Sequence, residues 1–417
     1  MAVDTPARIA ILGAGPIGLE TALYARFLGY EVDIIEQGRI GASVHDWSDV
    51  RMFSPFHMNC SSLGLAAIEA QDPEYQAPAK DALLTGGEWL TRYLLPLAQT
   101  DLLNDHIQQQ TTVVHVGRSQ LRKRDLPADD SRHSADFRIL LQDADGTERI
   151  GTSDVVIDTT GVYSQANWLG VGGIPAVGER QLRDQIHYRL PAILGDQRDR
   201  FAERTTLLIG SGYTAATNAV ALNNLISETT DTQVIWLTRK PAGTDPIRSI
   251  PDDRLPERAA LTAQANALAH GSDERFRYLG ETGVLSIEQR EGRYHVEIAG
   301  DPGETLVVDE VIANVGFRPD LSLFQELQVH QCYASEGPMK LAATLLAQDS
   351  ADCLDQAATG PDSLLNPEPN FYLLGSKSYG RNSNFLFAHG LQQVRDLFTV
   401  IGDREGLDLY AGMKHLG

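Results

Sequence analysis

A glycine-rich segment near the start of the chain has residue types that can hold a dinucleotide. An apolar run over 8–12 leads into Gly13-Ala14-Gly15-Pro16-Ile17-Gly18, which precedes helical apolar spacing over 19–29. Such glycines permit a sharp turn, a close approach of the backbone to a pyrophosphate, and tight packing of helix on strand. The next apolar run, 31–35, ends at Glu36, whose carboxylate can accept the hydroxyls of an unphosphorylated ribose. The spacing therefore predicts a strand–turn–helix–strand unit that binds a dinucleotide.

The same order of elements occurs a second time in the middle of the chain. An apolar run over 204–209 leads into Gly210-Ser211-Gly212-Tyr213-Thr214-Ala215 and then into a helix-like segment, 216–222. The following strand-like run, 233–238, ends at Arg239-Lys240 instead of an acid. A guanidinium grips a 2′-phosphate with a fork of hydrogen bonds, so we expect this second site to prefer NADPH over NADH. A solvated basic strand end is the alternative.

Composition excludes several other classes of function. The 417 residues include 35 Lys+Arg and 56 Asp+Glu, a formal net charge of −21, which argues against a protein that coats nucleic acid. Neither a bilayer-spanning apolar run nor the residue order of a signal peptide is evident, so we expect a cytoplasmic protein without a membrane partner. The three cysteines, Cys60, Cys332 and Cys353, are widely spaced, which disfavours a metal site and a CxxC redox pair.

Two further apolar runs each end in a small polar residue and a glycine. The run 154–159 is followed by Thr160 and Gly161, and the run 310–315 is followed by Gly316. With these connections and its two dinucleotide units, the chain resembles the two-dinucleotide-binding flavoprotein superfamily of FAD- and NAD(P)H-dependent oxidoreductases. The resemblance implies an α/β fold with two Rossmann-like domains. It places an NADPH-binding domain over 186–319, inserted into an FAD-binding domain made of 1–185 and 320–417.

The C-terminal part departs from this family in one place. A strand-like run over 370–374 ends at Gly375-Ser376, where family members usually place Gly-Asp, the acid of which holds the flavin ribityl chain. That departure weakens Ser376 as a flavin contact. Asn384 is a plausible N-cap for a helix over 385–394, and the resemblance implies that this helix points its N-terminus at the flavin. Alternatively, Asn384 is a plain cap, and His389 a buried, hydrogen-bonded histidine.

The residues around the predicted flavin bear on its chemistry. Reduction of a disulfide through the protein's own dithiol needs a cysteine pair, which the sequence lacks, and we expect Cys60 to be inert. The loop 38–56 resembles that of flavin-containing and N-hydroxylating monooxygenases, in which aromatic residues keep water from the reduced flavin. Trp47 and Phe53 would supply that wall, although packing between domains also explains them. Arg51 would face the flavin phosphates or a carboxylate.

Other polar segments are less specific. We expect the stretch 122–134 to be an exposed loop or hairpin. The segment 240–278, which contains Asp253 and Arg258, is expected to be a lid over the nicotinamide or a solvated helix start. His187 lies in a segment that matches only part of the flavin-containing monooxygenase fingerprint.

The sequence therefore predicts an FAD-dependent oxidoreductase that NADPH reduces, with monooxygenation of a small nitrogen- or sulfur-containing molecule as the favoured reaction. The alternatives are a reductase passing electrons to a quinone, a metal or a protein, and a flavin-binding redox sensor. The expected partners are the small-molecule substrate and oxygen, with a homodimer as one arrangement. The flavin would supply the chemistry, so only weak catalytic candidates are assigned, namely His389, Asn384 and His187. The predicted cofactor contacts are Gly13, Gly15, Pro16, Ile17, Gly18, Glu36, Gln37, Trp47, Arg51, Thr160, Gly161, Gly210, Gly212, Tyr213, Thr214, Arg239, Lys240, Gly316, Gly375, Ser376 and Asn384.

Overall fold

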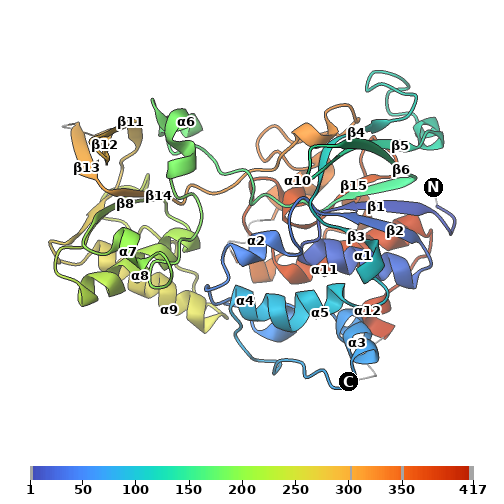
Figure 1. Cartoon of the computed structure of the whole chain (residues 1–417), viewed down its shortest axis with the longest axis horizontal. Helices are drawn as coiled ribbons and strands as arrows, with labels where there is room; N and C mark the ends of the chain where they lie inside the picture. The colour runs from blue at the N-terminus through green and yellow to red at the C-terminus, as the bar shows by residue number, and fades with distance from the viewer. Residues whose placement is uncertain (1–2, 301–302, 349–351, 413–417) are drawn as a thin grey trace. The chain divides into compact units, whose positions relative to one another are not determined.

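The computed structural model describes residues 3–300, 303–348 and 352–412, and it divides the chain into two compact units (Figure 1). Unit 1 consists of Met1–Gln165 and Arg318–Gly417, and unit 2 of Ala166–Phe317. The strands of unit 1 are β1 (Arg8–Leu12), β2 (Glu31–Ile35), β3 (Ile107–Gln108), β4 (Thr111–Arg118), β5 (Phe137–Asp143), β6 (Glu148–Ser153), β7 (Val155–Asp158) and β15 (Phe371–Leu373). Its helices are α1 (Pro16–Phe27), α2 (Ala42–His45), α3 (Ser62–Gln71), α4 (Gly86–Trp89), α5 (Leu95–Ala98), α10 (Met339–Leu346), α11 (Phe387–Ile401) and α12 (Leu409–Gly412).

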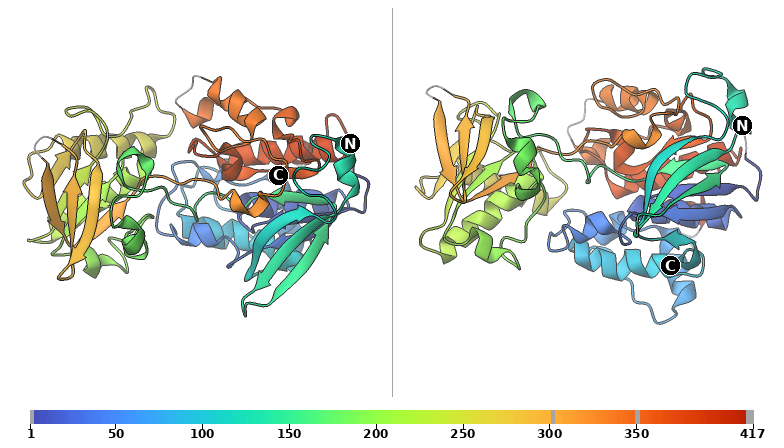
Figure 2. Two further views of the ribbon diagram at one scale, coloured as in Figure 1. Left: turned by 90° about the horizontal axis from the view of Figure 1, so that it is seen from above. Right: turned by 45° about the horizontal axis from the view of Figure 1, so that its top comes forward.

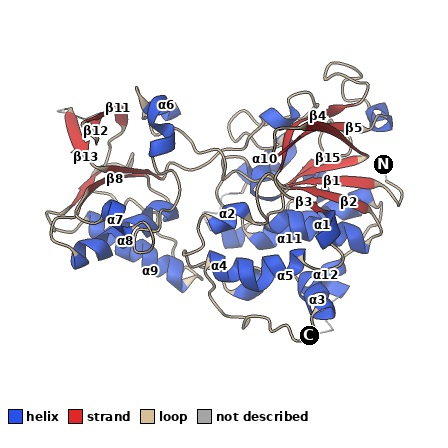
Figure 3. Cartoon of the chain, in the orientation of Figure 1, coloured by secondary structure: helices blue, strands red, loops and turns tan. Residues whose placement is uncertain are grey.

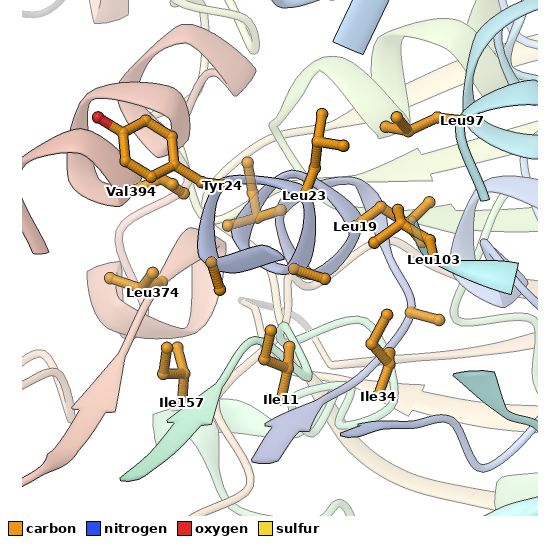
Figure 4. Packing of buried hydrophobic residues seen from close by; sticks show 14 of the residues in the cluster. Ile11, Leu19, Leu23, Tyr24, Ile34, Leu97, Leu103, Ile157, Leu374 and Val394 are labelled. Carbon is orange, nitrogen blue, oxygen red and sulfur yellow. The ribbon is translucent and has the colours of Figure 1, made fainter. Parts of the chain in front are cut away.

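Unit 1 is built in three layers around a parallel sheet with strand order β15-β7-β1-β2-β3. Successive side chains of a strand point to opposite faces, so the apolar runs of β1 and β2 supply two cores. On one face Ile11 and Ile34 lie under α1 and α11 (Figure 4). On the other face Ala10 and Ile35 pack against the antiparallel sheet β4-β5-β6 (Figure 2).

Unit 2 repeats this layering with a smaller set of elements. Its parallel sheet has the order β10-β9-β8-β14 and its antiparallel sheet the order β11-β12-β13. Figure 3 shows β11, β12 and β13 close to one another. Leu208 and Trp236 pack against α8 and α9, whereas Leu207 and Leu237 pack against the antiparallel sheet. The elements are α6 (Glu179–Leu182), α7 (Arg198–Phe201), β8 (Thr205–Ile209), α8 (Tyr213–Glu228), β9 (Gln233–Leu237), α9 (Pro256–Ala269), β10 (Phe276–Leu279), β11 (Val284–Arg290), β12 (Arg293–Ile298), β13 (Glu304–Val308) and β14 (Glu310–Ala313).

The α/β class with two parallel sheets confirms the predicted fold class. The second unit begins at Ala166, earlier than the expected boundary at 185–186, because the intervening segment is bound to unit 2. Gly170 and Val177 form bridges with β11, and the buried carboxylate of Glu179 accepts the N–H groups of Leu169 and Ala176. The assignment of FAD to unit 1 and NADPH to unit 2 stays a proposal.

Two polar segments differ from expectation. The stretch 122–134 is not simply an exposed loop, because the Arg132 guanidinium is wholly buried and donates to Glu368, with an N–O distance of 2.8 Å. Before α9, Arg258 and Asp253 form a buried pair at 2.7 Å rather than a solvated helix start, and Arg258 holds the pKa of Asp253 below its usual value. Both segments are therefore anchored by charged residues that satisfy each other.

Within the described ranges, none of the helices combines the length and the apolar character that crossing a membrane requires.

Candidate functional site

The three glycines after β1 have three different surroundings. Gly13 has φ of +100°, and a Cβ there would lie 3.2 Å from the Thr159 carbonyl oxygen. Gly15 caps α1 in an extended conformation, and a Cβ on it would meet nothing within 4 Å. A Cβ on Gly18 would lie 2.0 Å from the Gly13 carbonyl oxygen. The first and third glycines are thus needed for the fold, while the middle one, followed by Pro16 at the first helical position, opens a space that a pyrophosphate fits.

Glu36 lies beside this turn, as the sequence predicts. Its buried carboxylate accepts the N–H of Ala14 through Oε2 at 2.9 Å and the N–H of Gly38 through Oε1 at 2.8 Å. Each carboxylate oxygen accepts more than one hydrogen bond, so acceptor capacity remains for ribose hydroxyls. Gln37, the next residue, is exposed. The structure therefore brings the acid and the glycine turn together.

The ends of β7 and β15 reach the same edge of the sheet. Gly161, at φ of +70°, stands next to Ser376, whose Oγ would be 3.4 Å from a Cβ on that glycine. Gly375, at φ of +72°, faces Ile17 near the start of α1, at 3.5 Å. Four predicted contacts from three distant segments thus converge where the carboxyl ends of parallel strands hold ligands. Thr160 is exposed at this edge.

The helix after this edge begins later than expected. α11 starts at Phe387, so the prediction that Asn384 is its N-cap is wrong: Asn384 instead donates its N–H to the side chain of Asn382. His389 takes over at the helix start, because its Nδ1 accepts the N–H of Leu386 at 3.2 Å. Burial lowers the pKa of His389, which favours the neutral imidazole that this acceptor role needs.

An aromatic cluster packs against the start of α11 inside unit 1. Trp47 and Trp89 have ring centroids 6.3 Å apart, and Trp89 meets Phe387 edge to face at 5.6 Å. The Trp89 indole donates to the Asn59 carbonyl at 2.7 Å, which fixes its orientation. Arg51 is exposed and donates to the Leu83 carbonyl at 3.2 Å. Trp47 is therefore held in a cluster at the start of α11, while Arg51 binds a neighbouring loop.

The cysteines stay separate in the described part of the chain. Cys60, Cys332 and Cys353 form no disulfide. Burial, followed by the nearby Glu20 carboxyl, raises the pKa of Cys60 to about 12. The reactive form of cysteine is the thiolate, so Cys60 is a protonated, unreactive thiol at neutral pH.

The glycine turn of unit 2 repeats the geometry of the first. Gly210 has φ of +135°, and a Cβ there would lie 2.2 Å from the Asn314 carbonyl oxygen. Gly212 caps α8 in an extended conformation and, like Gly15, has nothing within 4 Å of its Cβ position. Ala215 is buried at the position that Gly18 has in unit 1. Tyr213 and Thr214 are the first two residues of the helix.

The end of β9 differs from the end of β2. Ile209 pairs with Leu237 as Leu12 pairs with Ile35, so Thr238 occupies the position of Glu36. The Thr238 hydroxyl is buried and lies 2.7 Å from the Tyr278 hydroxyl. Arg239 and Lys240 follow as exposed cations. The acid is thus replaced by a neutral residue, and the two cations come one and two positions later.

His187 and Gly316 lie near opposite ends of β14 in unit 2. His187 is 3.2 Å from the Glu310 carboxylate, at the amino end of β14, whereas the glycine turn is at the carboxyl end. Although burial opposes it, bonds from His187 and Arg200 hold the pKa of Glu310 below its usual value. Gly316 has φ of +82°, and its carbonyl oxygen accepts the Asn167 N–H at 2.9 Å. Both residues lie close to the sequence boundaries of unit 2. His187 therefore lies away from the glycine turn, whereas Gly316 follows Ala313, the sheet partner of Ile209, by three positions, as Gly161 follows Asp158 in unit 1.

Sequence comparison supports the predicted class. Residues 10–124 match the family model described as pyridine nucleotide-disulphide oxidoreductase. The chain has the fold of the FAD- and NAD(P)H-dependent oxidoreductases. The predicted resemblance is thereby confirmed at the level of the fold, while the binding of FAD and NADPH stays a proposal. No curated protein matches this chain in sequence.

Solved structures share this fold at low sequence identity. The bacillithiol disulfide reductase from Bacillus cereus is 17% identical, with 96% of this chain and 100% of that chain covered and a TM-score of 0.66. The ornithine N-hydroxylase from Kutzneria sp. 744 is 13% identical, with 96% and 100% covered and a TM-score of 0.60. A mutant flavin monooxygenase from Stenotrophomonas maltophilia is 19% identical, with 97% and 99% covered and a TM-score of 0.58. Reductases and monooxygenases among its structural neighbours thus share the fold of this chain.

Proposed function

We propose that this flavoprotein is a monooxygenase in which NADPH reduces FAD and a small nitrogen- or sulfur-containing molecule is oxygenated. The observation that carries the assignment of cofactors is the pair of glycine turns, each with an open middle glycine, Gly15 and Gly212. The first turn has Glu36 at its side, and the second has Arg239 and Lys240 close by in sequence. An acid suits an unphosphorylated ribose, and cations suit a 2′-phosphate.

Unit 1 has the residues to hold FAD. The first N–H groups of α1 and the space at Gly15 would receive the pyrophosphate, and Glu36 would accept the ribose hydroxyls. Gly161 and Ser376 would line the middle of the dinucleotide. Bound FAD would supply the redox chemistry, accepting two electrons from NADPH and passing them to oxygen, of which one atom enters the substrate and the other leaves as water.

Unit 2 has the residues to hold NADPH. The start of α8 and the space at Gly212 would receive its pyrophosphate. Arg239 would bind the 2′-phosphate through a fork of hydrogen bonds, and Lys240 would add a second positive charge. Thr238 carries no charge, so it does not repel that phosphate.

Two observations favour oxygenation over thiol chemistry. Cys60 is protonated at neutral pH, and Cys60, Cys332 and Cys353 form no disulfide in the described part of the chain. The cluster of Trp47, Trp89 and Phe387 places apolar surface at the start of α11, which would exclude water from a flavin bound there.

The second candidate is a reductase for a small disulfide or another electron acceptor. The family description and the bacillithiol disulfide reductase fold favour it. Such an enzyme would pass electrons directly from FAD to an external acceptor, because the chain's own cysteines do not provide an exchange pair.

Oxygen consumption separates the two candidates. FAD-loaded protein is mixed with NADPH and a panel of small amines and sulfides in air, and oxygen uptake, hydrogen peroxide and oxygenated product are measured. Monooxygenation predicts that one amine or sulfide raises oxygen uptake and forms product without matching peroxide. Anaerobic NADPH oxidation driven by disulfides or quinones, with no oxygenated product in air, would contradict it.

A further inference from the structure

A buried ion pair lies at the carboxyl edge of the unit 1 sheet. Lys377 Nζ is 2.6 Å from Asp158 Oδ2, and both side chains are wholly buried. The same Nζ donates to Thr160 Oγ1 at 2.8 Å. Asp158 Oδ1 in turn accepts the Thr160 N–H at 3.0 Å and the Thr160 hydroxyl at 2.7 Å. The ammonium, the carboxylate and the hydroxyl thus form a closed network in which each group contacts the other two.

The fold itself does not require this charge. Asp158 pairs with Leu12 in the sheet of unit 1, and Ala313 pairs with Ile209 at the corresponding position in unit 2. Ala313 is fully buried, so unit 2 builds the same three layers with a methyl group where unit 1 has a carboxylate. Burying two charges costs several kcal/mol per ion before their attraction is counted, and such pairs are weak evidence for stability. A role specific to unit 1 therefore explains the pair better than folding does.

The network joins the two segments that face the predicted FAD site. Asp158 is the last residue of β7 and Thr160 follows it by two positions, while Lys377 belongs to the 3-10 helix Gly375–Tyr379 that follows β15. Gly161 and Ser376 lie directly beside the network. A Cβ placed on Gly161 would be 3.4 Å from Ser376 Oγ. Thr160 is exposed, although its hydroxyl accepts a hydrogen bond from the buried Lys377 ammonium. Removing the ammonium would free the Thr160–Gly161 turn from the helix that carries Ser376.

We propose that Lys377 is a positioning residue for FAD, holding Thr160–Gly161 and Ser376 in register through the Asp158 carboxylate and the Thr160 hydroxyl. This inference rests on the proposed binding of FAD by unit 1. On this inference, Lys377 connects the segment after β7 to the 3-10 helix after β15, beside Ser376. Lys377 itself is buried, and its ammonium donates to the Asp158 carboxylate and to the Thr160 hydroxyl.

The same strand offers a matched control at its other end. Before β15, Glu368 forms a wholly buried network with Arg118 and Arg132, at 2.8 Å to each. This network is also buried and also links distant segments, but it lies at the amino end of β15, away from the edge that holds ligands. Arg118→Met leaves Glu368 paired with Arg132, so it tests the loss of a buried cation without disturbing the FAD edge.

The experiment measures FAD affinity and folding separately in the full chain. Apoprotein of the wild type, K377M, D158N/K377M, T160V and R118M is titrated with FAD by flavin fluorescence, and its unfolding is followed in urea. D158N/K377M replaces the ion pair with neutral side chains of similar volume, which removes the cost of an unpaired buried carboxylate. It is expected to unfold as the wild type does while binding FAD about tenfold or more weakly, the effect of losing a charge-assisted hydrogen bond.

The remaining variants make every outcome decisive. T160V is expected to weaken FAD binding about tenfold, and adding it to D158N/K377M is expected to weaken binding no further, because both act through one hydroxyl. R118M is expected to lower stability with FAD affinity unchanged. FAD affinity within twofold of the wild type in D158N/K377M, or in T160V should the former not fold, would overturn the inference. A wild-type protein that binds no FAD would instead overturn the proposed function.

Discussion

The two units have the same layers and the same glycine turn, but they have different side chains at the strand ends beside that turn. Each places helices on one face of a parallel sheet and a three-stranded antiparallel sheet on the other. Each has a first glycine in a left-handed turn against the neighbouring strand end, and a middle glycine facing open space. The shared part is the glycine turn, which we propose holds the pyrophosphate that both dinucleotides contain.

The differences lie at the strand ends. Glu36 in unit 1 corresponds to Thr238 in unit 2, and Asp158 corresponds to Ala313. Unit 1 therefore has buried charges at its ligand edge, whereas unit 2 has neutral residues there and exposed cations beyond them. On the proposed function, the backbone would provide the general affinity for a dinucleotide, and the residues one strand away would distinguish which dinucleotide binds.

Matched substitutions of the middle glycines test the shared cradle and have the largest expected effect. Gly15→Val is expected to weaken FAD binding about 100-fold or more, because the side chain fills the pyrophosphate space without meeting protein atoms. Gly212→Val is expected to leave FAD bound and raise the KM for NADPH by a similar factor. Both are measured on purified protein as flavin content and steady-state rates. Gly18→Val is the control, since its Cβ would collide with the Gly13 carbonyl and prevent folding. A Gly15→Val protein that retains one FAD per chain would show that the space at Gly15 does not hold the FAD pyrophosphate.

A buried acid in α1 tests the electrostatic difference between the units. Burial raises the pKa of Glu20 to about 7, although hydrogen bonds from Tyr93, Ser61 and Tyr410 act to lower it. The corresponding residue of α8 is Thr217, which carries no charge. Because the folded state holds this proton more tightly than the unfolded chain, Glu20 costs stability as pH rises from about 4.3 to 7. The loss amounts to about 4 kcal/mol above that range.

Urea unfolding at a series of pH values measures this loss. E20Q keeps an acceptor for Tyr93 and removes the charge, so the variant is expected to gain stability relative to the wild type as pH rises. Equal pH dependence in both proteins would show that Glu20 does not titrate in this range.

The cations after β9 test which nucleotide unit 2 prefers. Arg239→Ala is expected to raise the KM for NADPH about 10- to 50-fold, the worth of a charge-assisted phosphate contact, with the KM for NADH nearly unchanged. Lys240→Ala is expected to have a smaller effect, because an ammonium binds phosphate as a point charge. The ratio of kcat/KM for the two nucleotides is the measurement. Equal losses with both nucleotides would remove Arg239 from 2′-phosphate recognition.

Cys60 gives the smallest expected effect. Its thiol is protonated at neutral pH, so Cys60→Ser is expected to keep NADPH oxidation and substrate turnover within about twofold. A loss of turnover together with trapping of a reactive thiolate by iodoacetamide in the wild type would instead favour the disulfide reductase candidate.

Local spacing was sufficient to predict the two cradles. The glycines, the following helix and Glu36 all lie within one strand–turn–helix–strand unit, so their geometry follows from residues close in sequence. The register of β9 was harder: the cations were assigned to the strand end, whereas Thr238 occupies the position of the acid.

Contacts between distant segments could not be predicted in the same way. Lys377 and Asp158 are 219 positions apart, and a lone lysine in the sequence carries no sign that it will be buried. The helix after Asn384 begins later than predicted because the Asn382 side chain accepts the Asn384 N–H and keeps that segment in a turn. His187 was a candidate by local resemblance, yet pairing with Glu310 places it at the amino end of the sheet.

The most direct test of the account is an anaerobic titration of the full chain. Apoprotein is saturated with FAD, freed of excess by gel filtration, and mixed with NADPH or NADH while the flavin absorbance is followed. The account predicts one FAD per chain and bleaching by NADPH that is faster than bleaching by NADH at equal concentration. A chain that retains no FAD, or that holds FAD which neither nucleotide bleaches, would contradict it.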